Sequence, residues 1–109
     1  MIWVLLGSAI ISEVAGTLAL RASEGLSRPH WAAATLTGYL IAFALLAQVL
    51  KLGMPVGVAY GIWAAAGVAL TAVAGRLLWA DPLTPAMGIG IVLIVAGVLF
   101  VEVGSQAAN

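Results

Sequence analysis

Cysteine is absent from this chain of 109 residues, and charged side chains make up only 7% of it. The absence of cysteine excludes disulfides, thiolate nucleophiles and zinc–thiolate sites. The single histidine, His30, cannot hold a metal ion unaided. A soluble domain carries charge on about a quarter of its residues. With so little charge, most of the surface is apolar, and we expect that surface to face lipid.

The few charges also balance, because four basic and four acidic residues give a formal net charge of zero. The sequence has no basic patch for nucleic acid and no cluster of lysine and arginine for anionic lipid. Its serines and its histidine lack the second base and the orienting acid that nucleophilic catalysis needs. We therefore expect no nucleic-acid partner, no enzymatic activity and no cofactor.

Apolar sequence is what the chain has instead, with 64% hydrophobic residues and a mean hydropathy of +1.21. Four runs of about 20 residues, the length needed to cross a bilayer core, cover 2–20, 31–50, 56–79 and 85–103. They are continuously apolar rather than alternating, which excludes a membrane β-barrel and favours helices. Short breaks with proline or glycine join them, so neighbours run antiparallel. We predict an all-α integral membrane protein, a four-transmembrane-helix bundle in a single membrane domain over 1–109.

The connections give only a weak signal for the orientation of this bundle. Arg21, Arg28 and Arg76 fall on one side of the membrane, and Lys51 falls on the other with the amino terminus. A bias this small is compatible with insertion in both directions. Transport sites are commonly built from inverted repeats that meet at the membrane midplane. Two oppositely inserted copies would supply that symmetry, so we expect an antiparallel dual-topology dimer; the alternative is a single preferred orientation.

Glu13 is the most informative residue, because it lies in the middle of the first apolar run with no other charge nearby. A carboxylate in lipid costs several kcal/mol, so such a residue marks a functional site by default. A carboxyl that is short of water can be neutralised by a proton or by an organic cation. The alternative is a structural glutamate held by a hydrogen bond or an ion pair.

Helical spacing places mostly small side chains on the face of Glu13, which leaves room for a ligand or another backbone. The candidates for this face of the binding site are Leu6, Ala9, Ile10, Gly16 and Thr17.

Aromatic residues in the second and third runs are candidates for binding a greasy cation, because their rings offer apolar surface and cation–π attraction. Trp63 stands mid-span, away from the interfaces that tryptophan prefers, and Tyr60 lies one turn before it. Its indole N–H needs a partner there, and Glu13 is a candidate. Tyr39 and Phe43, one turn apart, invite the same interpretation. Packing within the bundle is the alternative for all four rings.

Glycine recurs every seven residues in the last run, at Gly90, Gly97 and Gly104, with Ile94 on the same face. Small residues in register let membrane helices approach closely and associate. We expect Gly90, Ile94 and Gly97 to form an oligomer interface, with packing inside one monomer as the alternative.

In order and spacing, five segments together resemble the small multidrug resistance family of short, four-helix, proton-coupled exporters. The match covers nearly the whole chain. The segments are Ser12-Glu13-Val14 with Gly16-Thr17, Ser23-Glu24-Gly25, Leu45-Leu46-Ala47-Gln48, Pro55-Val-Gly57-Val-Ala-Tyr60-Gly-Ile-Trp63 and Gly90-Ile-Val-Leu-Ile-Val-Ala-Gly97-Val98.

The resemblance implies an antiparallel homodimer in the bacterial cytoplasmic (inner) membrane that exchanges protons for small hydrophobic cations by alternating access. It implies that Glu13 is the essential glutamate and that Tyr39, Tyr60 and Trp63 belong to the site. Gly16-Thr17 resembles the exporters of quaternary ammonium and polyaromatic cations. The chain departs from the family pattern at Ala44, Ala64 and Ala65-Ala66, where the family usually has an aromatic, a hydroxyl residue and the start of a glycine bend.

Two other functions are compatible with the sequence. One is a guanidinium or polyamine exporter, or one half of a heteromeric pair. The other is a non-transporting membrane scaffold subunit, in which Glu13 makes a hydrogen bond between helices.

Overall fold

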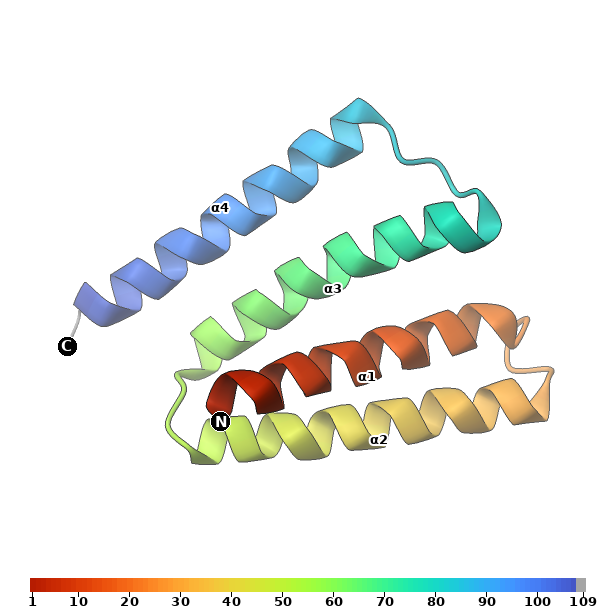
Figure 1. The fold of residues 1–109 in the computed structure, drawn as a ribbon, viewed down its shortest axis with the longest axis horizontal. Helices are drawn as coiled ribbons and strands as arrows, with labels where there is room; N and C mark the ends of the chain where they lie inside the picture. Colours follow the sequence, from red (N-terminus) through yellow and green to blue (C-terminus); the bar gives the residue numbers. More distant parts are fainter. Residues whose placement is uncertain (108–109) are drawn as a thin grey trace. The chain divides into compact units, whose positions relative to one another are not determined.

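The computed structural model describes residues 1–107, which form four α-helices joined by short connections (Figure 1). The helices are α1 (Ile2–Ala22), α2 (Pro29–Lys51), α3 (Val56–Trp79) and α4 (Pro85–Ala107). No strand occurs within 1–107. All four helices are long and apolar enough to cross a membrane. The predicted all-α fold with four membrane-spanning helices is therefore confirmed, whereas the single domain and the dimer stay predictions.

The helix ends follow local capping more closely than hydropathy. Helices α2 and α4 begin at Pro29 and Pro85, where a fixed φ and a missing N–H suit the first turn. The Thr84 hydroxyl oxygen accepts a hydrogen bond from the backbone N–H of Met87 at 3.2 Å, which caps α4. Helix α4 continues to Ala107, beyond the predicted end at 103, because its last turn is polar rather than non-helical.

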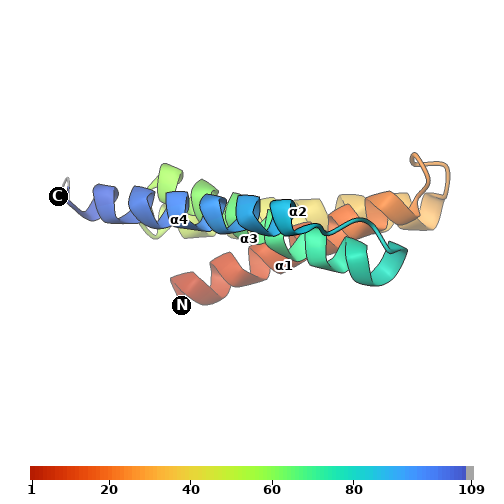
Figure 2. The ribbon, with the colours of Figure 1, turned by 90° about the horizontal axis from the view of Figure 1, so that it is seen from above.

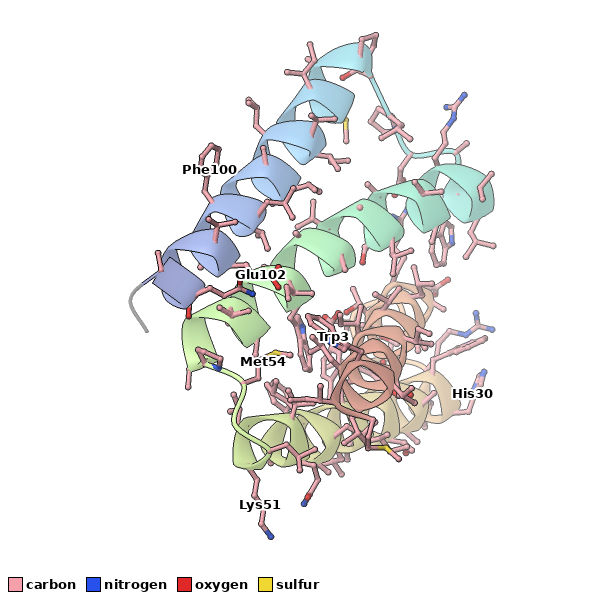
Figure 3. All side chains as sticks on the ribbon, turned by 60° about the vertical axis from the view of Figure 1, so that its left-hand side comes forward. Trp3, His30, Lys51, Met54, Phe100 and Glu102 are labelled. Carbon is pink, nitrogen blue, oxygen red and sulfur yellow. The ribbon has the colours of Figure 1, made fainter. Side chains whose placement is uncertain are left out.

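The chain divides into two compact units, residues 1–52 and 53–109. In the first unit α1 and α2 lie side by side and antiparallel (Figure 1). In the view from above they cross at an angle (Figure 2). His30 and Lys51 mark the two ends of α2 (Figure 3). Small and β-branched residues are buried along α2 at intervals of seven, at Thr35, Ala42 and Val49.

The connection from α1 to α2 is built around the fully buried Ser23. Its hydroxyl donates to the Leu20 carbonyl at 2.6 Å and accepts from the Leu26 N–H at 3.0 Å. The three residues after it are left-handed, with φ of 51° at Glu24, 74° at Gly25 and 69° at Leu26. Side-chain hydrogen bonds thus reverse the chain within a few residues and bring α2 back against α1.

The second unit pairs α3 with α4, which touch where Gly61 faces Val98. Helix α3 is capped by Ala80, a left-handed residue with φ of 54°, whose N–H donates to the Arg76 carbonyl at 3.1 Å. No residue of α4 is buried. Phe100 points away from α3 and is 79% exposed (Figure 3). Most of the apolar surface of α4 is therefore uncovered within this chain.

Candidate functional site

Glu13 lies at the middle of α1, half-buried, and its carboxylate is hydrogen-bonded within the same helix. The hydroxyl of Thr17 donates to Glu13 Oε1 at 2.9 Å. The two residues are four apart, the spacing that places side chains above one another on a helix. Glu13 thus has a fixed polar neighbour inside an otherwise apolar span.

Tyr39 extends this contact from α1 to α2. Its hydroxyl lies 2.8 Å from Thr17 Oγ1, so Glu13, Thr17 and Tyr39 form one chain of hydrogen bonds. The ring of Tyr39 lies directly over Gly16. A Cβ at Gly16 would come within 2.9 Å of Tyr39 Cδ1 and 3.0 Å of Cε1. The lack of a side chain at Gly16 is therefore what lets the tyrosine ring lie against α1 and reach Thr17.

Gly38 is a part of this site that the sequence reasoning missed. A Cβ there would come within 2.9 Å of the Ser12 carbonyl oxygen and 3.1 Å of Gly16 Cα. The backbones of α1 and α2 touch at this point, one residue from Tyr39. The signal was present in the small residues Thr35, Gly38 and Ala42, which share one helical face.

Other residues predicted for the α1 face are buried, namely Leu6 at 1% exposed, Ala9 at 0% and Ile10 at 6%. Phe43, one turn beyond Tyr39, is 59% exposed. The structure therefore gathers Glu13, Thr17 and Tyr39 into hydrogen-bond contact and leaves the Phe43 ring at the surface of the chain.

The two aromatic residues of α3 that were predicted for the site differ in exposure although they are three residues apart. Trp63 is 8% exposed and Tyr60 is 68% exposed. They belong to the second unit, and their contact with Glu13 stays a prediction.

The remaining carboxylates lie at helix ends or in connections. Glu24 follows α1, Asp81 follows α3, and Glu102 lies in the last turns of α4 (Figure 3). Within 1–107 no three histidine, aspartate or glutamate side chains gather into a group that could hold a metal ion. Glu13 is thus the acidic group placed deepest in a span.

The glycine stripe of α4 is open on the side that the sequence predicted as an interface. Gly90 is half-buried, Ile94 is 40% exposed, and Gly97 is exposed. A Cβ at Gly90 or at Gly97 would meet nothing within 4 Å. An apolar groove of about 330 Å³ follows another face of α4 and is lined by Ala96, Leu99, Phe100 and Val103.

Comparison with known proteins identifies the family to which the four membrane-spanning helices belong. A family model described as Small Multidrug Resistance protein matches residues 1–102. Quaternary ammonium compound-resistance protein QacE of Escherichia coli is 40% identical over 106 residues, which cover 97% of this chain and 96% of that protein. Multidrug transporter PA4990 of Pseudomonas aeruginosa is 38% identical over 104 residues, which cover 95% and 94%.

A third relative is named for a different substrate. Spermidine export protein MdtI of Salmonella paratyphi A is 35% identical over 97 residues, which cover 89% of this chain and 88% of that protein. These relatives are named as transporters or resistance proteins rather than as enzymes. The chain is therefore a multi-pass protein of the bacterial inner membrane and belongs to the small multidrug resistance family of transporters.

Proposed function

We propose that this transporter is a proton-coupled antiporter that exports small hydrophobic cations, quaternary ammonium compounds in particular, by alternating access. The observation that carries the proposal is the carboxyl of Glu13, half-buried at mid-span and held by Thr17. A carboxylate at that depth is costly unless it has a use, and exchanging one positive charge for another is such a use.

Coupling follows from competition at this carboxyl. A proton and an organic cation each neutralise Glu13, and neither binds while the other holds it. A ligand shifts a conformational equilibrium only as far as it binds the two states differently. On the inner side the cation displaces the proton from Glu13, and on the outer side a proton displaces the cation, so proton entry drives cation export.

The substrate class follows from what surrounds the charge. Buried apolar side chains at Leu6, Ala9 and Ile10 share the face of Glu13, with the Tyr39 ring opposite. A carboxylate beside apolar and aromatic surface suits a cation with one charge and greasy substituents. Quaternary ammonium compounds, named in one of the relatives, have this character.

We also propose that two copies pair in opposite orientations through α4. The helix has no buried residue in the single chain, and its glycine stripe is open. Close approach at small residues is a common way for membrane helices to associate. The weak basic bias among Arg21, Arg28, Arg76 and Lys51 is compatible with two orientations.

Gly97→Val tests this interface, because a side chain at Gly97 meets nothing inside its own chain. We expect the variant to fold as a monomer and to lose the dimer band after cross-linking in detergent. Gly88→Val is the matched control, since its position on α4 is equally open. If both variants cross-link as well as the parent protein, the interface lies elsewhere.

Glu13→Gln tests the carboxyl. It keeps the size of the side chain and one acceptor oxygen, and it removes the charge. We expect the variant to insert and to dimerise, but to show no pH-dependent binding of tetraphenylphosphonium and no proton-driven uptake in vesicles. Glu24→Gln, which removes an exposed connection carboxylate, is the control and should behave like the parent. Proton-driven uptake by Glu13→Gln would overturn the proposal and favour a scaffold role.

Polyamine and guanidinium transport are separated by competition. Spermidine has several charges and needs several acceptors, whereas each chain offers one carboxyl in the middle of a span. We expect unlabelled tetraphenylphosphonium to displace a bound quaternary ammonium probe at far lower concentration than spermidine or guanidinium does. The reverse order would assign the chain to polyamine or guanidinium export. Binding that appears only after a second, different subunit is added would indicate a heteromer.

A further inference from the structure

In the hydrogen-bond chain Glu13–Thr17–Tyr39, counting the available hydrogens shows which group donates at each bond. A threonine hydroxyl has one hydrogen and two lone pairs. Thr17 donates its hydrogen to Glu13 Oε1 at 2.9 Å. At its 2.8 Å contact with Tyr39 it therefore accepts, and the tyrosine O–H donates. Both hydroxyl hydrogens point toward the carboxylate, as expected while Glu13 is charged.

Thr17 departs from the usual behaviour of threonine in a helix. Such a hydroxyl commonly donates to the backbone carbonyl four residues earlier. Thr35 on α2 does so, with a 3.0 Å bond to the Trp31 carbonyl. Thr17 instead bonds the side chain four residues earlier and a ring on the next helix. Its hydroxyl therefore bonds two side chains of the site rather than the backbone of its own helix.

Protonation of Glu13 turns its carboxyl group from a hydrogen-bond acceptor into a donor. A carboxylic acid donates one O–H. When the acid donates to Thr17 Oγ1, the threonine O–H rotates to donate to the tyrosine oxygen, and the tyrosine O–H turns to another acceptor. Each oxygen keeps its own hydrogen throughout. The only net change is the proton that solvent delivers to the carboxyl.

We propose that Thr17 is a positioning residue that makes the donor direction of the Tyr39 hydroxyl follow the charge of Glu13. The protonation state of Glu13 on α1 is thereby transmitted to a ring on α2, 22 residues from Thr17 in sequence. This inference rests on the proposed function, since it concerns how the same carboxyl signals whether it has bound a proton. The Tyr39 hydroxyl therefore responds when Glu13 is protonated. It does not respond when a cation binds, because Glu13 then stays ionised.

Arg21 is the ionisable side chain of α1 one turn beyond Thr17 and two turns beyond Glu13. Glu24 and Arg28 lie in the connection that follows α1, and His30 and Lys51 stand at the ends of α2 (Figure 3). Tyr39 is the titratable side chain of α2 that reaches Glu13 through Thr17. In the proposed dimer the Glu13 of a second copy would also act on this carboxyl.

Gly16 and Gly38 hold the geometry that the relay needs. The Tyr39 ring lies against Gly16, and the helix backbones touch at Gly38. The tyrosine oxygen therefore has little freedom to leave Thr17 as long as the helices stay packed. A change in hydrogen-bond direction, rather than a swing of the ring, is the response this packing permits.

The test is isotope-edited infrared spectroscopy of labelled tyrosine, whose C–O stretch differs between a donating and an accepting hydroxyl. The chain has two tyrosines, so Tyr60→Phe leaves Tyr39 as the only reporter. In this background we expect the band to shift in step with the Glu13 carboxyl band across a pH series. Thr17→Val should abolish the shift, and Thr17→Ser, which keeps the hydroxyl, should retain it.

Proton release on adding tetraphenylphosphonium is measured on the same samples and separates the two proposals. Release with an unmoved tyrosine band would overturn the relay and leave the antiporter intact. A band shift that survives Thr17→Val would also overturn it, because Tyr39 would then sense Glu13 by another route. Absence of release in the parent protein, which keeps both Thr17 and Tyr60 and is measured in parallel, would instead overturn the antiporter.

Discussion

Gly38→Ala is the change whose effect the structure defines most closely. The new Cβ would lie 2.9 Å from the Ser12 carbonyl oxygen, 3.1 Å from Gly16 Cα and 3.2 Å from Gly16 N. All three are backbone atoms, so no side chain can rotate out of the way. To restore an ordinary contact of 3.4 Å, α1 and α2 must separate by about 0.5 Å at this point.

The cost of that separation follows from known magnitudes. Overpacking a tight contact costs about 1–3 kcal/mol, and replacing glycine by alanine inside a helix returns about 1 kcal/mol. We expect a net loss of up to roughly 2 kcal/mol in the free energy of unfolding. The same separation would lengthen the 2.8 Å contact between Thr17 and Tyr39 toward the limit of a hydrogen bond.

The assay is unfolding in mixed detergent micelles, followed by tryptophan fluorescence. Gly7→Ala is the control, because a Cβ at Gly7 on α1 meets nothing within 4 Å. We expect Gly7→Ala to match or slightly exceed the parent and Gly38→Ala to unfold at lower denaturant. Equal stability of the two variants would refute the close contact of α1 and α2 at Gly38.

Two further substitutions probe the site and the end of α3. Gly16→Ala pushes mainly on the Tyr39 ring, a side chain that can yield, so we expect a smaller stability loss than for Gly38→Ala. We also expect the pH-dependent shift of the Tyr39 infrared band to be lost, and an unchanged band shift would contradict the ring placement. Ala80→Gly removes the steric cost of a left-handed alanine and should stabilise the protein by about 1 kcal/mol in the same unfolding assay, whereas a destabilised variant would argue against the left-handed end of α3.

The fold was largely predictable because hydropathy and length are strong signals in membrane proteins. The predicted runs 2–20, 31–50 and 56–79 located α1, α2 and α3 to within two residues at each end. The end of α4 was predicted too early, because a polar last turn lowers hydropathy without ending a helix. Helix ends depend on backbone hydrogen bonds, which composition reports only indirectly.

The candidate site was predictable within one helix and less so between helices. Spacing placed Thr17 with Glu13, because positions four apart share a helical face. It could not give the 2.8 Å contact from Thr17 to Tyr39, which depends on how α1 and α2 cross. The helices can cross so closely because Gly38 has no side chain. A contact that depends on a missing side chain is hard to recognise in one sequence.

The central claim is that protons and organic cations compete for the carboxyl of Glu13. The most direct measurement is the proton release that follows addition of tetraphenylphosphonium to the purified protein across a pH series. We predict release while Glu13 is protonated, fading as pH rises and the carboxyl ionises, and none at any pH from Glu13→Gln. Cation binding without proton release at every pH, or equal release from Glu13→Gln, would contradict the account.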